Sequence, residues 1–267
     1  MLIALTDYCS MGCNHCLSDC TTDGKHITIE QLKKNLDFAY DLIGHSTMQC
    51  IVFSGGEPFE HPEIKQILEV ITAYQKRFPQ VGTIIATNGY PLAHDKDLYN
   101  WYRDFTKNHA RNLLTQVTAV KEYYPKHLIE KDVYWLNKIK NCSVVDEKSE
   151  INLYPQGRAL TLDSPQWDTK APKCVNLRLM SKQTQETSFK HIVNMMPVGK
   201  YCTPRINIDG SISLGESRLC PPIGTVHDDL RVLGEKVKKF NCKGCSISLE
   251  ILKETNALAY NMIARVD

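Results

Sequence analysis

The feature that most constrains this chain is a group of three cysteines near its start. Cys9, Cys13 and Cys16 are separated by three and then two residues, and they follow directly on the apolar run Leu2–Leu5. This run predicts a strand that delivers three thiols into one tight loop. Three thiolates can hold a metal centre, and a centre that takes four ligands would then keep one position open. We expect the chemistry of the protein at that open position.

The length and composition indicate one large domain, or a core with a small appendage, in a reducing compartment. Apolar residues make up 42% of the 267 residues, and 32 basic side chains against 30 acidic ones leave a net charge of +2. A charge so balanced argues against nucleic acid and anionic membranes as partners. No apolar run approaches the roughly 20 residues of a membrane span, and no secretion signal opens the chain. We therefore expect a cytoplasmic protein, in which the eleven cysteines are metal ligands or catalysts rather than disulfides.

Strand-like and helical patterns alternate through the first 160 residues. The expected strands cover residues 2–5, 50–53, 83–86, 113–120 and 151–154, and the expected helices cover residues 28–44, 62–79, 98–105 and 133–139. This alternation predicts an α/β fold with a parallel sheet, whose functional loops gather at the carboxyl ends of the strands.

The alternation ends near residue 160. A crossing segment is expected over residues 165–185, followed by a hairpin with a two-residue turn at Asp209-Gly210 and by helices at 230–240 and 247–263. We therefore divide the chain into a core of residues 1–165 and a C-terminal region of residues 166–267.

A second motif gives the cysteine loop a family context. The stretch Gly55-Gly56-Glu57-Pro58 follows the second predicted strand. Together with the cysteine loop after the first strand, it resembles the radical S-adenosylmethionine (radical SAM) enzymes over residues 1 to about 160. This resemblance implies a partial (β/α)6 TIM-like barrel with a small C-terminal extension.

The resemblance also implies cofactors. Cys9, Cys13 and Cys16 would bind three irons of a [4Fe-4S] cluster, and the fourth iron would bind S-adenosylmethionine. The reduced cluster would cleave this molecule to a 5′-deoxyadenosyl radical, which takes a hydrogen atom from a substrate. Without the second motif, a zinc site with His15 or Cys20 as fourth ligand would also fit these cysteines.

Further residues are implied to bind S-adenosylmethionine. Gly55 and Gly56 would let the backbone approach the ligand closely, and Glu57, beside Pro58, would accept a hydrogen bond from its ammonium group. Further polar positions follow or lie on later strands. Thr87 and Asn88 follow the third strand, and Gln116 and Thr118 lie on the fourth strand, where they would contact the ribose hydroxyls. Gly157 and Arg158 follow the fifth strand and would lie near the adenosine. Arg158 is alternatively a solvated loop residue.

A second group of cysteines lies near the C-terminus. Cys202 and Cys220 bracket the predicted hairpin, and Cys242 and Cys245 form a Cys-x-x-Cys pair. The pattern resembles a SPASM extension in its shortened form, the twitch domain, which carries one auxiliary [4Fe-4S] cluster. A four-cysteine zinc site fits the same spacing.

The leading functional hypothesis is an oxidation or cross-link of a peptide or a small polar metabolite, with the auxiliary cluster as electron acceptor. One alternative is a redox-neutral epimerase in which a thiol such as Cys174 donates the hydrogen atom. Another is a non-catalytic iron–sulfur or zinc-binding interaction module. The resemblance implies a flavodoxin- or ferredoxin-like electron donor. Because the chain starts at its first strand, peptide recognition would need a separate protein.

Overall fold

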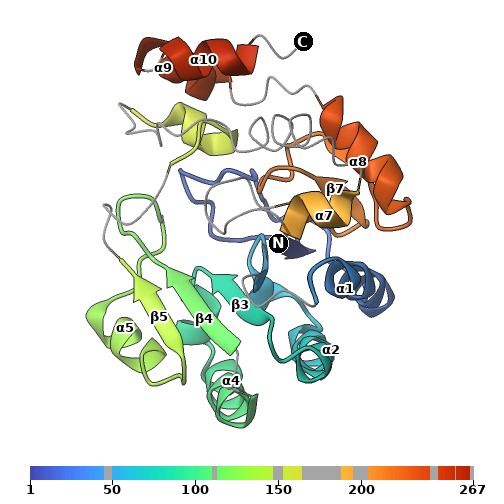
Figure 1. Ribbon diagram of the computed structural model, residues 1–267. Coiled ribbons are helices and arrows are strands. Elements are labelled where there is room, and N and C mark those ends of the chain that lie inside the picture. Colours follow the sequence, from blue (N-terminus) through green and yellow to red (C-terminus); the bar gives the residue numbers. More distant parts are fainter. Residues whose placement is uncertain are drawn as a thin grey trace.

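The computed structural model describes residues 1–44, 50–109, 113–146, 153–163, 188–194, 204–240, 246–255 and 257–264. Within them, a single eight-stranded sheet has the order β5-β4-β3-β2-β1-β6-β7-β8 (Figure 1). Its strands are β1 (Leu2–Thr6), β2 (Cys50–Gly55), β3 (Gly82–Thr87), β4 (Leu113–Thr118), β5 (Cys142–Val145), β6 (Arg205–Ile206), β7 (Ser211–Ser213) and β8 (Pro222–Thr225).

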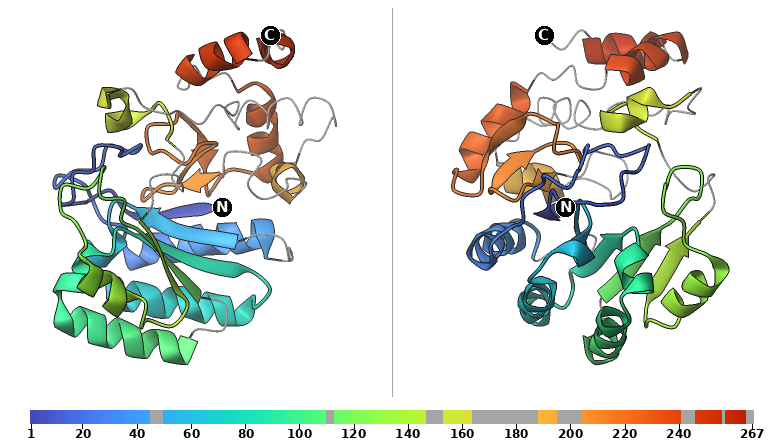
Figure 2. Two further views of the ribbon diagram at one scale, coloured as in Figure 1. Left: turned by 90° about the vertical axis from the view of Figure 1, so that its left-hand side faces the viewer. Right: turned by 180° about the vertical axis from the view of Figure 1, so that it is seen from behind.

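The first five strands form the parallel part of the sheet. Each pairs in parallel with the next, from β1 with β2 to β4 with β5. The helices that connect them lie along one side of the sheet in both views of Figure 2. These connecting helices are α1 (Ile29–Ile43), α2 (Ile64–Arg77), α3 (Tyr90–His94), α4 (Lys96–His109) and α5 (Glu130–Leu136). The predicted α/β class with a parallel, partial-barrel core is confirmed.

Local sequence signals set the bounds of α1. Thr28 lies outside the helix in an extended conformation, and its side chain accepts a hydrogen bond from the Gln31 backbone amide. Leu32, Leu36 and Ala39 are fully buried against the sheet, as their helical spacing predicts. The helix ends before Gly44, which matches the expected range.

Two elements of the core differ from the prediction. The fifth strand is β5, Cys142–Val145, whereas the sequence pattern predicts it at residues 151–154. Residues 151 and 152 lie outside the described part of the chain, and Leu153 forms only an isolated bridge. β5 escaped prediction because it has four residues and a burial pattern without alternation. The short helix α3 was also not predicted.

The remaining α-helices of the described residues lie after the core. They are α7 (Phe189–Asn194), which was not predicted, α8 (Leu230–Lys238), α9 (Ser246–Thr255) and α10 (Ala257–Ala264). The helix expected at 247–263 corresponds to α9 and α10, and residue 256 between them lies outside the described residues. In the described residues, no helix combines the length and the apolar character that a membrane crossing needs.

The C-terminal hairpin extends the main sheet. β6 and β7 are antiparallel, and β6 pairs in parallel with β1, with Leu2 opposite Arg205. The predicted hairpin is present, but its turn is longer than two residues: Asn207 donates to the Ser211 carbonyl at 2.8 Å, and Gly210, at φ 82°, donates to Asn207 at 3.0 Å. The predicted domain boundary at residue 165 lies outside the described residues.

A buried arginine fastens the hairpin to the core. Arg205 is 1% exposed and forms an ion pair with Asp7, directly after β1, at 3.4 Å. Its other nitrogens donate to the Asn207 side chain at 2.6 Å and to the Glu216 carbonyl at 3.0 Å. A buried guanidinium requires such partners, so these contacts fix β6 beside β1.

Candidate metal centre and cofactor pocket

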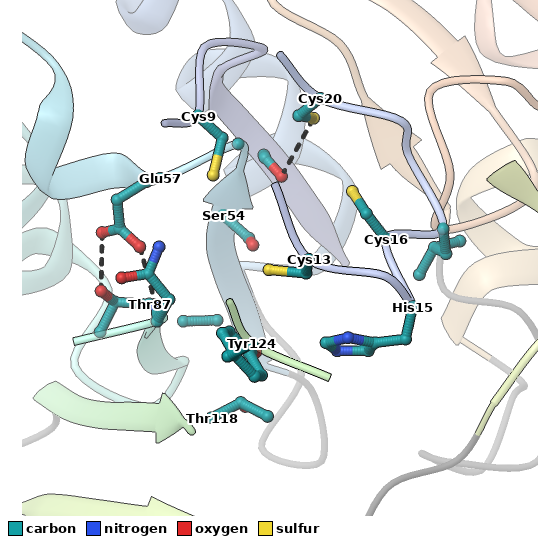
Figure 3. Close-up of a pocket in the computed structure, with 15 residues that line it drawn as sticks. Cys9, Cys13, His15, Cys16, Cys20, Ser54, Glu57, Thr87, Thr118 and Tyr124 are labelled. Atoms are coloured by element: carbon teal, nitrogen blue, oxygen red, sulfur yellow. Dashed lines mark hydrogen bonds between the residues drawn. The ribbon is translucent and has the colours of Figure 1, made fainter. Parts of the chain in front are cut away.

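A pocket opens at the carboxyl ends of β1 to β4 (Figure 3). Its wall includes residues from the loop after β1, the ends of β2, β3 and β4, and the loop after β4. The lining residues are Cys9, Cys13, His15, Cys16, Leu17, Cys20, Ser54, Gly55, Gly56, Glu57, Ala86, Thr87, Asn88, Thr118 and Tyr124. The structure thus brings together the cysteine loop and most of the polar positions singled out in the sequence.

The cysteine loop, residues 7–20, is shaped by backbone hydrogen bonds. Cys9 donates to the Thr21 carbonyl at 2.9 Å, and Cys16 donates to the Cys13 carbonyl at 3.2 Å. Gly12 has φ 68°, a value that favours glycine, and it turns the chain between the first two cysteines. The result is a tight loop in which three thiols from eight consecutive residues face one pocket.

Gly55 and Gly56 permit a close approach of two backbones. A Cβ on Gly55 would overlap the Thr6 carbonyl oxygen, and a Cβ on Gly56 would overlap the Tyr8 carbonyl oxygen. The Gly56 amide donates to Thr6 at 2.6 Å, and the Glu57 amide donates to Tyr8 at 2.9 Å. From the sequence, we expect this closeness to serve a ligand. The structure shows that the two glycines also join the end of β2 to the start of the cysteine loop.

Glu57 is fully buried and joins β2 to β3. Its carboxylate accepts hydrogen bonds from the Phe59 amide at 3.0 Å, the Thr87 hydroxyl at 2.6 Å and the Asn88 amide at 2.8 Å. Burial raises the pKa of Glu57 to about 7, even though these three hydrogen bonds act to lower it. Pro58, the next residue, is buried at the start of the short helix η1 (Pro58–Glu60) and does not line the pocket.

The thiols differ in their protonation. Burial raises the pKa of Cys9 to about 11 and raises that of Cys13 as well, so both are neutral thiols at pH 7 without a metal. A hydrogen bond with the Cys20 side chain lowers the pKa of Cys16 and raises that of Cys20. Because metal ions bind thiolates, loading of this site would release protons.

The donor set fits an iron–sulfur cluster. Among the described residues, no three acidic, histidine or cysteine side chains surround one point as the ligands of a single metal ion do. A [4Fe-4S] cluster binds each thiolate on a different iron, so its ligands need only face a common space. Cys9, Cys13 and Cys16 meet that requirement.

An aromatic group closes another part of the pocket. His15 packs against Tyr123 and Tyr124 at ring-centroid distances of 4.9 and 5.1 Å. Burial lowers the pKa of His15 to about 4, with a further contribution from the charge of Arg158, so the ring is neutral. Tyr124 and Ser54 were missed in the sequence analysis. Ser54 lies directly before the glycine pair and could have been found there, whereas no motif marks Tyr124.

Besides Pro58, three further predicted residues lie outside the lining. Gln116 is exposed on β4, on the same face as Thr118. Gly157 and Arg158 begin the short helix η3 (Gly157–Thr161), and they contact the backbone of the cysteine loop. The structure thus assigns Arg158 neither a solvated position nor a place in the pocket wall.

Only one of the C-terminal cysteines lies in the described chain. Cys220 lies within hydrogen-bonding distance of the Gln156 side chain, 3.8 Å from its amide nitrogen. Its backbone amide donates to Ser217 at 3.1 Å. Cys202, Cys242, Cys245 and Cys174 lie outside the described residues, so their roles stay predictions.

Comparison with known proteins gives a domain match and a fold. Residues 2–108 match the 4Fe-4S single cluster domain family. No curated protein matches the chain. The crystal structure of BtrN in complex with AdoMet and 2-DOIA has a TM-score of 0.55 at 13% identity, over 97% of this chain and 91% of that chain. Native anSMEcpe with bound AdoMet and Cp18Cys peptide has a TM-score of 0.53 at 12% identity, over 98% and 86%.

At such identities the two structures establish a shared fold. Both of these structures were solved with AdoMet bound. The iron–sulfur domain match covers the cysteine loop and the Gly55–Pro58 stretch, the two motifs that carried the resemblance. Together, the domain match over residues 2–108 and the shared fold confirm the resemblance to the radical S-adenosylmethionine enzymes that these two motifs carried.

Proposed function

We propose that the protein is an enzyme that binds a [4Fe-4S] cluster through Cys9, Cys13 and Cys16 and binds S-adenosylmethionine beside it. The observation that carries this proposal is that these three thiols share the wall of one pocket with Gly55–Glu57. When bound and reduced, such a cluster supplies the electron for reductive cleavage of S-adenosylmethionine, which starts radical chemistry at a substrate C–H bond.

The polar side of the pocket suits the methionine end of this ligand. A carboxylate has about four acceptor positions, and Glu57 uses three of them within the protein. The remaining position is suited to the ammonium group of the ligand. Thr118 and Asn88 offer further polar atoms, while the neutral rings of His15 and Tyr124 limit the access of water.

The second step of the reaction is assigned to the C-terminal cysteines. Cys202, Cys220, Cys242 and Cys245 would hold an auxiliary [4Fe-4S] cluster whose irons are all ligated, which suits electron transfer better than substrate binding. The net reaction would then be an oxidation or a cross-link. Its support is the placement of Cys220, whose turn also contacts the cysteine loop.

The substrate class within this proposal is a peptide or a small polar metabolite. The two solved structures support both, because BtrN was crystallised with 2-DOIA and anSMEcpe with Cp18Cys peptide. A flavodoxin- or ferredoxin-like electron donor and, for a peptide, a separate recognition protein complete the proposal.

The first experiment tests the cluster and the cleavage reaction. Anaerobically reconstituted protein is mixed with dithionite and S-adenosylmethionine, and 5′-deoxyadenosine is quantified. We expect its formation by the wild type and its loss in Cys13→Ala. Cys142→Ala is the matched control, since Cys142 is also largely shielded from solvent but lies on β5, outside the pocket. Full activity of Cys13→Ala, or zinc alone at the site, refutes the proposal.

The second experiment tests the auxiliary centre. Two [4Fe-4S] clusters give about eight irons per chain. Cys220→Ala and Cys242→Ala should each reduce this to about four and still allow cleavage of S-adenosylmethionine. Unchanged iron content in both variants excludes the auxiliary cluster and leaves the first site intact.

A further inference from the structure

Arg158 reaches three of the four cysteines in the pocket wall through their carbonyl groups. Its backbone amide donates to the Cys16 carbonyl at 3.0 Å. Its side chain donates through Nε to the Cys13 carbonyl at 2.9 Å and through Nη1 to the Cys20 carbonyl at 3.1 Å. A single residue, more than 130 positions further along the chain, therefore holds the loop from Cys13 to Cys20.

The contact depends on the shape of the guanidinium group and on the residue before it. The planar fork of an arginine can donate to several acceptors at fixed angles, which the single ammonium of a lysine cannot reproduce. Gly157 has φ 57°, and a Cβ there would overlap the Cys16 carbonyl oxygen. The approach of residue 158 is thus possible only because residue 157 is a glycine.

Arg158 contacts the backbone of the cysteine loop, and the thiols of the loop face the pocket. The residue binds backbone oxygens, whereas the sulfur atoms of Cys9, Cys13 and Cys16 belong to the pocket wall. The side chain is 26% exposed, and its counter-ion Asp19, at 2.8 Å, is 47% exposed. The positive charge therefore lies closer to the protein interior than the negative charge that balances it.

We propose that Arg158 is a positioning residue that holds the cysteine loop in its cluster-binding shape and whose charge raises the reduction potential of the cluster. The inference rests on the proposed function, because it requires a cluster at Cys9, Cys13 and Cys16. A nearby cation stabilises the extra electron of the reduced state, and local charge is one of the factors that set cluster potentials. Asp19 reduces this effect as a counter-ion.

The experiment compares four variants of the full chain after anaerobic reconstitution. Arg158→Gln removes the charge and the fork, Arg158→Lys removes only the fork, and Asp19→Asn removes the counter-ion. Asparagine is suited to that position because Asp19 has φ 51°, where asparagine is well tolerated. Arg103→Gln is the matched control, since Arg103 forms a similar ion pair with Asp104 on α4, outside the pocket.

Two readouts separate the two effects. The first is the rate of iron loss to a chelator, which we expect to rise about tenfold in both Arg158 variants because charge-assisted hydrogen bonds are lost. The second is the midpoint potential of the cluster signal that Cys13→Ala abolishes. We expect Arg158→Gln to lower the reduction equilibrium about tenfold, which is 59 mV for one electron. Arg158→Lys should keep the wild-type potential, and Asp19→Asn should raise it.

The outcomes distinguish this inference from the function on which it rests. If Cys13→Ala keeps all of the iron of the wild type, the proposed function fails and the inference fails with it. If the cluster is at that site and Arg158→Gln matches Arg103→Gln in both readouts, the inference alone is refuted. A purely structural role would lower the potential in Asp19→Asn too, or leave it unchanged, and either result overturns the electrostatic part. Should Arg158→Gln fail to fold by circular dichroism, Arg158→Lys and Asp19→Asn still decide both parts.

Discussion

Two sides of the same pocket are held in different ways. The polar side, formed by Glu57, Thr87 and Asn88, is fixed by hydrogen bonds among its own members. The cysteine loop on the other side is fixed from outside, by Arg158 and by the turn at Ser217 and Arg218. The polar side should therefore be sensitive to changes within its motif, and the cysteine loop to changes far from its motif in the sequence.

The C-terminal turn strengthens this contrast. Ser217 donates to the Leu17 carbonyl at 2.7 Å, and Arg218 donates to the Ser18 and Asp19 carbonyls at 2.5 and 2.9 Å. These acceptors lie between Cys16 and Cys20. The shape of the loop that carries the thiols thus depends on residues about 200 positions away.

The largest effect is expected at Gly157. Gly157→Ala places a Cβ on the Cys16 carbonyl oxygen at a positive φ, and we expect a loss of about 2–4 kcal/mol in the free energy of unfolding. Urea denaturation measures this loss, and iron content measures the damage to the loop. Gly82→Ala is the control, because its Cβ would meet only the Cys50 side chain at 3.4 Å. Equal stability of the two variants would mean that the loop does not depend on this distant contact.

The next effect is expected at Glu57 and depends on pH. Glu57→Gln should reduce the free energy of unfolding by about 1–3 kcal/mol at pH 5, because the amide offers one acceptor atom instead of two oxygens. The folded pKa of about 7 lies above the ordinary glutamate pKa of 4.5, so the wild type binds more protons folded than unfolded between these values. The contribution is complete below pH 4.5 and is lost as the pH rises through about 7.

Urea denaturation of wild type and Glu57→Gln from pH 4.5 to 8 checks this sign. The difference in stability between them should shrink as the pH rises. Glu30→Gln serves as the control, because the Glu30 side chain is 80% exposed and the change should stay within about 0.5 kcal/mol. A difference that grows with pH would show that Glu57 is stabilised as a carboxylate.

A smaller effect is expected at Thr87. Thr87→Val removes the hydroxyl that donates to Glu57 and accepts from the Gly89 amide at 2.9 Å, which should cost about 1–2 kcal/mol. Because this hydrogen bond lowers the pKa of Glu57, its loss should move the pH transition to higher pH. The double variant with Glu57→Gln tests the coupling: strictly additive losses would indicate that the polar side is not held by its own members.

The smallest effect is expected at Cys20. It lines the pocket and is 1% exposed, yet it lies outside the three-cysteine motif. Cys20→Ala should cost about 1 kcal/mol and keep the iron content of the wild type, whereas Cys13→Ala should lose the cluster. Iron analysis of both variants side by side decides the matter, and equal losses would make Cys20 a fourth ligand.

The sequence predicted what local patterns determine. The cap at Thr28, the thiols after β1 and the polar residues after β2 and β3 each follow from a few neighbouring residues. The strand β5 and the pairing of β6 with β1 did not follow, because short strands carry weak periodicity and strand partners are chosen by contacts across the fold. The hydrogen-bond partners of Arg158 could not be predicted for the same reason, because the residues beside it in the sequence do not indicate a contact with Cys13.

The place of β1 in the sheet has a consequence for the making of the protein. β1 leaves the ribosome before its neighbour β6, which follows about 200 residues later. At typical synthesis rates, that interval is about 10 to 40 seconds. During this time the turn at Ser217 and Arg218, which later contacts the cysteine loop, has not yet been synthesised. A cluster inserted into the growing chain would therefore bind a loop that lacks these contacts.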